Sequence, residues 1–242
     1  MDRPDAVAAR RILAVFAHPD DETSVAGGTI ARSVQEGVEV TVVTATRGEW
    51  GTLGTGGMTI AREDLPAVRE SEHRAVMRLY GAHPPVFLGY EDATMGEADL
   101  APAVRQVAAE MQRVRPDVVI TWGPTGMSRH PDHIAVHQAT VEAFHAYAAS
   151  APARLYYAAL PLDVARRFEA DLDGPEARPT IRIDITAHLQ TKAKALRIYR
   201  SQEDAQAIAE VLEQAPSWTA SEYFHQAYPA VDGAVPKSTL WE

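Results

Sequence analysis

Residues 11–22, RILAVFAHPDDE, contain the feature that decides the fold and points to a site. An apolar run of the kind that forms a buried β-strand ends in one histidine and three consecutive acids. Packing alone does not explain so much charge, although acids at this place can also cap the helix that follows. The stretch therefore predicts a strand end at which polar groups gather, namely His18, Asp20, Asp21 and Glu22.

Strand-like and helix-like segments alternate over the first 150 residues. Apolar and β-branched runs predict strands over residues 11–17, 38–46, 85–90, 117–123, 154–160 and 180–186. Helical patterns occupy residues 25–36, 61–81, 99–115, 130–150, 187–202 and 204–215. This alternation predicts an α/β fold with a mainly parallel sheet and helices on both faces.

A second polar cluster follows the fourth expected strand, in the segment GPTGMSRHPDHIAVH at residues 123–137. Parallel sheets of this type bind ligands at the carboxyl ends of strands, where the strand order reverses, and the first and fourth strands are commonly neighbours there. His130 and His133 are three residues apart at a helix start, so their imidazoles can converge. We expect Asp132 to point elsewhere and His137 to be a packing or surface histidine.

Composition limits the kinds of protein that this chain can be. Its 242 residues suit one domain, and the lack of cysteine excludes disulfides, thiolate ligands and a cysteine nucleophile. A formal net charge of -10 argues against nucleic acid as a partner. The first residues lack the apolar core of a signal peptide and no run is long enough to span a membrane, so we expect a cytoplasmic protein.

Histidines and carboxylates that meet at one crevice suit a divalent metal ion such as zinc, which leaves one position open for water in catalytic sites. A carboxylate outside the ligand set could then act as general base, and the remaining histidine could stabilise an oxyanion or serve the leaving group. Spacing alone does not separate the roles of Asp20 and Asp21.

AHPDDE at residues 17–22, followed by HPDH at residues 130–133, resembles the signature of the LmbE-like or PIG-L-type zinc-dependent N-acetylglucosaminyl deacetylases. The resemblance extends over residues 27–51, 68–81 and 183–202. It implies a single Rossmann-like, three-layer α/β/α domain over residues 1–242. The last part of the chain shows no such resemblance, and we expect an appended helical or irregular segment from about residue 203. The family resemblance also implies removal of the acetyl group from an N-acetylglucosaminyl or similar N-acyl amino-sugar conjugate, giving a free amine and acetate.

The resemblance also implies a role for each polar residue of the two clusters. It makes His18, Asp21 and His133 the ligands of Zn²⁺, with Fe²⁺ left open. It makes Asp20 the general base that activates water. His130 then steadies the tetrahedral intermediate or protonates the amine as it leaves.

Two further positions bear on the substrate. Arg69 resembles an arginine that some members use to bind substrate, and a helix-surface ion pair with Glu72 or His73 is the alternative. Tyr199 stands where many relatives show histidine, which weakens any inference about the substrate.

The glycine-rich loop at residues 47–59, RGEWGTLGTGGMT, lacks the lysine of a Walker-type phosphate loop. We expect either a mobile surface loop or a lid over the sugar. A lid is possible because the loop leaves the second strand at the same sheet edge as the metal cluster. Trp50 could stack on a sugar ring or pack the loop down.

Two other functions share parts of this pattern. A metal-dependent amidase acting on a thiol or other amide conjugate would use the same catalytic residues, whereas a phosphoesterase would need more acids and cations near the clusters. A non-catalytic sugar- or nucleotide-binding module would not need both clusters. The expected partner is a small-molecule amino-sugar conjugate, with no nucleic acid and no membrane span, and a homo-oligomer stays open.

Overall fold

The computed structural model describes residues 9–168, 172–214, 216–231 and 236–241. Within these residues seven strands form one sheet in the order β3-β2-β1-β4-β5-β7-β6. The first five strands are parallel, and β7 runs antiparallel to both β5 and β6. The strands are β1 (Arg11–Phe16), β2 (Glu39–Thr44), β3 (Val86–Phe87), β4 (Val118–Thr121), β5 (Arg154–Ala159), β6 (Ile181–Asp184) and β7 (Ser221–Tyr228).

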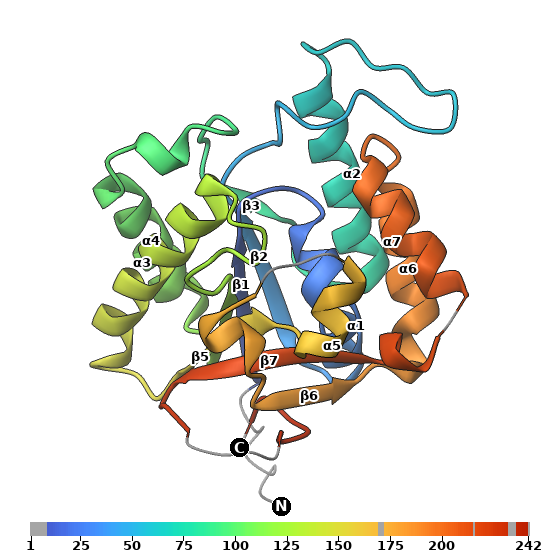
Figure 1. Cartoon of the computed structure of the whole chain (residues 1–242). Helices are drawn as coiled ribbons and strands as arrows, with labels where there is room; N and C mark the ends of the chain where they lie inside the picture. Colours follow the sequence, from blue (N-terminus) through green and yellow to red (C-terminus); the bar gives the residue numbers. More distant parts are fainter. Residues whose placement is uncertain (1–8, 169–171, 215, 232–235, 242) are drawn as a thin grey trace, which may run out of the picture.

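Helices cover both faces of the sheet, as Figure 1 shows. Helices α3 and α4 lie on one side, and α1, α2, α6 and α7 lie on the other. The α-helices are α1 (Asp21–Gln35), α2 (Leu65–Tyr80), α3 (Ala101–Val114), α4 (Pro131–Ala148), α5 (Leu162–Ala165), α6 (Leu189–Ile198) and α7 (Glu203–Glu213). Short 3-10 helices span Met95–Glu97, Arg166–Phe168, Gly174–Ala177, Thr186–His188 and Ser217–Thr219. In the part of the chain that the structure describes, no helix combines the length and apolar character needed to cross a bilayer.

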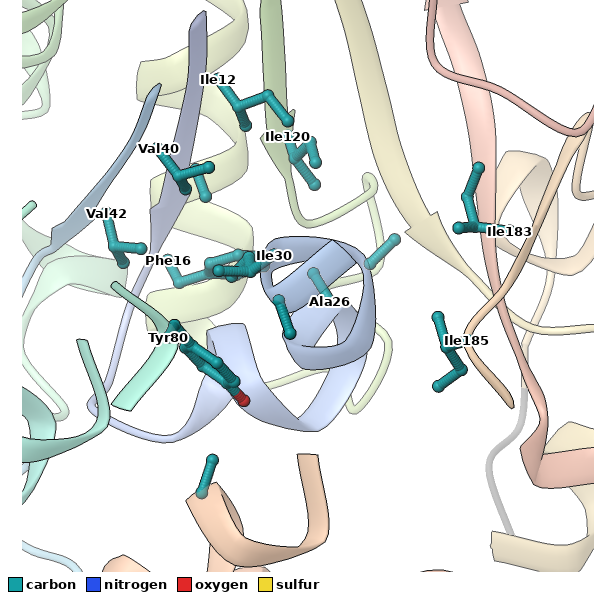
Figure 2. Close-up of a cluster of buried hydrophobic side chains, with 14 of the residues drawn as sticks. Ile12, Phe16, Ala26, Ile30, Val40, Val42, Tyr80, Ile120, Ile183 and Ile185 are labelled. Atoms are coloured by element: carbon teal, nitrogen blue, oxygen red, sulfur yellow. The ribbon is translucent and has the colours of Figure 1, made fainter. Parts of the chain in front are cut away.

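Strand β1 lies between two hydrophobic cores. Successive side chains of a strand point to opposite faces, so a strand that is covered on both sides reads as a continuous apolar run. Ile12 and Phe16 belong to one hydrophobic cluster with Ile30 of α1, part of which Figure 2 shows, whereas Leu13 and Val15 belong to the core under α3 and α4. The apolar run before the first polar cluster is therefore the centre of a three-layer α/β/α fold.

The strand order confirms the sequence-based prediction of a mainly parallel sheet with β1 beside β4. Ile12 pairs with Val118 across these two strands. Helix α1 begins at Asp21, four residues before the predicted start, because the acids of the first cluster form its first turn, where negative charge favours a helix. Strand β3 is shorter than predicted, and Gly89, with φ of 83°, turns the chain soon after it.

The segment that was expected to be an appended helical or irregular part also contains β7, which lies inside the sheet between β5 and β6. The burial of β7 alternates, with Glu222, Phe224 and Gln226 pointing inward. Two of these three inward positions are polar. The sequence of β7 therefore lacks the alternation of apolar and polar residues that marks a half-buried strand.

Candidate metal centre and active site

The two polar clusters meet at the carboxyl ends of β1 and β4. His18 follows β1, His130 is the N-cap of α4, and His133 lies in the first turn of that helix. The Nδ1 of His18 lies 3.2 Å from the Nε2 of His133, and the rings of His18 and His130 are 4.7 Å apart between centroids. Residues more than a hundred positions apart thus converge on one point, as the switch-point argument predicts.

Asp21 completes a set of donors around the two facing nitrogens. Its Oδ2 lies 3.7 Å from His18 Nδ1, and its Oδ1 lies 3.5 Å from His133 Nε2. A tetrahedral zinc ion with bonds of about 2.0–2.2 Å separates its ligand atoms by roughly 3.3–3.6 Å. The spacing and chemistry of these three side chains therefore fit one such ion.

Neighbouring groups orient each of the three side chains. His133 Nδ1 lies 2.9 Å from the carbonyl oxygen of Gly126, which leaves Nε2 free to bind a metal. Asp21 Oδ2 accepts hydrogen bonds from the backbone N–H groups of Ala17 and His18, at 3.1 and 2.9 Å, and from Trp122 Nε1 at 3.3 Å. Metal ligands are commonly held in this way by the groups behind them.

Two acids that sequence reasoning missed lie on the other side of the His18 ring. The Nε2 of His18 is 2.9 Å from Asp92 Oδ1 and 3.4 Å from Asp132 Oδ2. The expectation that Asp132 points elsewhere is wrong, because its carboxylate accepts hydrogen bonds from the backbone N–H groups of Ala93 and Met95 and turns toward His18. Its place in the first turn of α4, between two histidines, was a signal for this, whereas Asp92 comes from a loop with no motif.

These acids create a strongly negative environment around His18. Burial lowers the pKa of His18, but Asp132, Asp92 and Asp21 outweigh that effect and raise the pKa to about 10. Burial raises the pKa of Asp92, but the hydrogen bond and charge of His18 outweigh it and hold the pKa below its usual value. Such a concentration of negative charge favours a cation.

Among the residues that the structure describes, two groups have donor atoms that all lie within 4.8 Å of one another and could hold an ion. One combines His18 with His130 and His133, and the other combines His18 with Asp92 and Asp132. Both groups include His18, but Asp92 and Asp132 lie near its Nε2, whereas Asp21 and His133 lie near its Nδ1.

Asp20 is buried beside this centre in an unusual backbone conformation. Its φ of 106° and ψ of -27° lie in the left-handed region, which non-glycine residues rarely adopt and which is enriched at functional sites. Its backbone N–H donates to Oε2 of Glu22 at 3.1 Å. Burial raises the pKa of Asp20 well above its usual value, and the charge of Arg69 opposes that rise.

Arg69 is only 4% exposed, so the predicted surface ion pair with Glu72 or His73 is not what the structure contains. Its guanidinium donates to Asp20 Oδ2 at 2.8 Å and to the carbonyl oxygens of Pro19 and Gly48 at 2.6 and 3.1 Å. Arg69 therefore holds the loop that carries Asp20.

A buried polar network lies behind Asp20. Oε1 of Glu22 accepts a hydrogen bond from the Tyr199 hydroxyl at 2.7 Å. That hydroxyl lies 2.6 Å from His73 Nδ1, and His73 Nε2 lies 2.9 Å from Thr44 Oγ1. Burial raises the pKa of Glu22, but His73 and Tyr199 outweigh it, so the pKa lies below its usual value. The network fixes the carboxylate that holds the backbone of Asp20.

The glycine-rich loop over residues 47–59 docks onto the chain just before α7. Oγ1 of Thr52 donates to the carbonyl oxygen of Ser201, and Oγ1 of Thr55 donates to that of Arg200, both at 2.7 Å. Trp50 is 60% exposed, although its backbone N–H donates to Asp92. A lid function for this loop stays a prediction.

The three-layer α/β/α fold is that of a Rossmann-like protein. Its histidine and carboxylate cluster, at the point where the strand order reverses, is a candidate metal centre. The family model described as PIG-L, GlcNAc-PI de-N-acetylase, matches residues 13–144, which is more than half of the chain. The chain belongs to this family, and the resemblance noted in its motifs is confirmed.

Two similar proteins are both named 1D-myo-inositol 2-acetamido-2-deoxy-alpha-D-glucopyranoside deacetylase. The one from Rhodococcus erythropolis is 40% identical over 59% of this chain, and the chain spans only 55% of its length. The one from Thermobifida fusca is 33% identical and is matched over 80% of this chain and 83% of its own length.

Several solved structures share the fold. The conserved protein TT1542 from Thermus thermophilus is 28% identical with a TM-score of 0.68, covering 92% of this chain and 96% of its own. The N,N'-diacetylchitobiose deacetylase from Pyrococcus horikoshii is 22% identical with a TM-score of 0.67, covering 90% and 84%. The 4-carboxy-2-hydroxymuconate hydratase GalB from Pseudomonas putida is also 22% identical, with a TM-score of 0.70, covering 93% and 98%. The fold alone therefore does not determine the reaction.

Proposed function

We propose that this chain is a metal-dependent hydrolase that removes the acetyl group from an N-acetylglucosaminyl or similar N-acyl amino-sugar conjugate. The family assignment and the names of the relatives support an N-deacetylase. The observation that carries the proposal is the convergence of His18, Asp21 and His133 on one point, with donor atoms 3.2–3.7 Å apart. A binding module of the same fold has no need for such a centre.

His18, Asp21 and His133 would hold the ion, with zinc as the expected metal and ferrous iron as the alternative. When bound, a divalent ion supplies Lewis acidity toward the amide carbonyl and toward water. The nitrogen and oxygen donors of this site suit either metal.

Asp20 is the proposed general base. Its buried carboxylate shares the wall of a cavity with Asp21 and His133, so it lies beside the place where the amide must bind. Burial favours the protonated form of Asp20, whereas the adjacent guanidinium of Arg69 favours the carboxylate, which allows a proton to be taken and returned.

His130 is the proposed group on the leaving side. Its Nδ1 accepts a hydrogen bond from the backbone N–H of Asp132 at 3.2 Å, so Nε2 is the atom that can donate to the oxyanion or to the amine. Water oxygen adds to the carbonyl carbon, the C–N bond breaks, and the amine nitrogen gains a proton. The products are a free amine and acetate.

Replacement of Asp20 by Asn tests the proposal, because Asn tolerates the left-handed backbone that this position requires. We expect turnover to fall by about 10²–10⁴-fold, the usual contribution of a general base, while about one ion per chain remains bound. The rate is measured as amine released from a panel of N-acetylglucosaminides, with zinc and with iron, and the metal by elemental analysis. Asp163→Asn, on an exposed position of α5, is the control.

Full activity of Asp20→Asn with the metal bound would contradict the role of Asp20. A purified chain that contains no metal and cannot be reloaded would instead favour a sugar- or nucleotide-binding module. Release of an amine only from thiol or other amide conjugates would favour the related amidase. A cytoplasmic location and the oligomeric state stay predictions.

A further inference from the structure

A cavity of about 300 Å³ adjoins the candidate metal centre. Asp20, Asp21 and His133 contribute to its wall. Most of the other side chains in the wall are apolar, and they come from the loop before α4, from the region of α5 and from the region of α7. They include Met127, Leu160, Val164, Ile208, Leu212 and Trp218.

Besides Asp20 and Asp21, three charged side chains line this wall: Asp204 is exposed in the first turn of α7, and Lys192 and Glu222 are satisfied by groups of the protein. Lys192 Nζ donates to Glu222 Oε1 at 2.7 Å and to the carbonyl oxygen of Ser24 at 2.8 Å. The carboxylate of Glu222 also accepts the backbone N–H groups of Gly28 and Thr29. Recognition of a polyol needs several convergent polar groups that are free to bind it, so this wall suits an apolar ligand better than a sugar.

The position of His130 indicates which part of the substrate enters the cavity. The carbonyl carbon of an amide bears an oxygen, a nitrogen and an acyl substituent. Where His130 protonates the leaving amine, which is one of its two proposed roles, the nitrogen lies beside it, and His130 is not among the residues of the wall to which Asp20 and His133 contribute. The amino sugar then lies on the His130 side, and the acyl substituent points toward the cavity.

We infer that this cavity binds an acyl chain longer than acetyl, and that the chain hydrolyses N-acyl amino sugars with medium-length acyl groups such as hexanoyl. This inference rests on the proposed hydrolase function and specifies its substrate class. An apolar cavity of about 150 Å³ can bind benzene, so about twice that volume holds a chain of several carbons, whereas an acetyl methyl group leaves most of it unfilled.

The chemistry is the same hydrolysis with a longer acid as product. Water oxygen forms a bond to the carbonyl carbon, Asp20 takes a proton from that water, and the C–N bond breaks as the nitrogen receives a proton. A medium-chain carboxylate and the free amino sugar are released, and no oxidant or other co-reactant is needed.

A chain-length series tests the inference, using N-acetyl-, N-butanoyl-, N-hexanoyl- and N-octanoylglucosamine on the metal-loaded protein. Each methylene that leaves water for an apolar site is worth a factor of about four, so the hexanoyl compound should exceed the acetyl compound at least tenfold in kcat/KM. Affinities measured by calorimetry should rise with chain length in the same order.

Ile208→Trp fills the cavity from α7 without altering any residue of the proposed catalytic set. We expect it to abolish the preference for hexanoyl, which is measured as a fall of at least tenfold in the ratio of kcat/KM for the hexanoyl compound to kcat/KM for the acetyl compound. Ala207→Trp, on the neighbouring exposed position, is the matched control and should leave the preference intact. If Ile208→Trp does not fold, Val164→Phe on α5 replaces it, with exposed Leu162→Phe as its control.

The results separate this inference from the proposed function. Hydrolysis of the acetyl compound with no gain for longer chains overturns the inference alone. Hydrolysis of none of the compounds overturns the proposed function, and the calorimetric series then decides the cavity by itself. Affinity that does not rise with chain length, or that rises equally in Ile208→Trp, overturns the inference.

Discussion

Arg69 Nη2 lies 2.8 Å from Asp20 Oδ2, and both side chains are buried. The guanidinium also donates to the carbonyl oxygens of Pro19, in the loop after β1, and of Gly48, in the loop after β2. These hydrogen bonds connect the two loops. The pair therefore both positions the proposed base and favours its charged form against the effect of burial. This arrangement supports a role for Arg69 through Asp20, and the direct contact with substrate that the family resemblance implies stays a prediction.

Replacement of Arg69 by Met should lower kcat by at least tenfold and leave KM within about threefold, because a buried side chain has little surface to offer a substrate. Breaking a buried ion pair typically costs about 3–5 kcal/mol, so Tm should also fall. Steady-state kinetics and thermal unfolding measure both effects. Arg74→Met, which removes a partly exposed partner of Glu70 from the same helix, is the control. A large rise in KM with kcat unchanged would restore the substrate-binding role that the family resemblance implies.

Removal of the metal should inactivate the protein and lower its stability. A ligand present at about a thousand times its Kd stabilises the folded state by about 4 kcal/mol, and each kcal/mol shifts Tm by about 2–4 °C in a chain of this size. Chelated protein should therefore melt at least about 8 °C below zinc-loaded protein, and added zinc should restore both Tm and activity. His133→Ala should abolish the shift, whereas His145→Ala, on the exposed face of α4, should retain it. Equal melting with and without metal would contradict the centre around His18.

The sequence allowed the central part of this site to be located because its residues lie at regular element boundaries. His18 follows a continuous apolar strand, and His133 lies in the first turn of the helix that follows another such strand. In a parallel sheet these two ends must meet if the strands are neighbours, as β1 and β4 are. Periodicity and topology were therefore sufficient to bring together His18, Asp21 and His133, whose roles the family resemblance then suggested.

The parts that were missed depend on tertiary contacts that leave no local pattern. Asp92 reaches His18 from an irregular loop, whose path depends on contacts such as the hydrogen bonds from Ala93 and Met95 to Asp132. Strand β7 was missed because Glu222 turns inward to pair with a buried lysine, which removes the apolar alternation that marks a strand. Each of these polar residues is recognisable only when its partner is known.

Tyr199 should be required for the stability of the network behind the base. Its hydroxyl donates to Glu22 and is fully buried, so Tyr199→Phe leaves a buried carboxylate short of a donor. An unsatisfied buried polar group costs about 1–3 kcal/mol, or more for a charged group. Denaturant unfolding should show a loss of at least this size, and kcat should fall because Glu22 holds the backbone of Asp20. Tyr90→Phe, at a partly exposed position, should do neither. Unfolding curves that coincide with those of the parent protein would show that the network contributes nothing.

His137 links the loop after β4 to helix α4. Its Nδ1 lies 2.9 Å from the carbonyl oxygen of Trp122, and its ring contacts that of Tyr157 at 5.0 Å between centroids. Burial lowers the pKa of His137 below its usual value, although the bond to Trp122 and the charge of Glu176 partly oppose this effect. The folded protein therefore holds His137 neutral over a range of pH in which an unfolded chain would protonate it.

This difference should appear in the pH dependence of stability. Below the unfolded pKa of about 6.5 the unfolded chain binds a proton that folded His137 does not, so His137 makes folding less favourable as the pH falls. The loss of unfolding free energy between pH 7.5 and 5.5 should be smaller in His137→Gln than in the parent protein, with both metal-loaded. His145→Gln, which alters an exposed histidine of the same helix, should keep the parental slope. If the unfolding free energy of His137→Gln and of the parent protein changed equally with pH, His137 would titrate alike in the folded and the unfolded chain. The contact of His137 with Trp122 would then not contribute to the acid sensitivity of the fold.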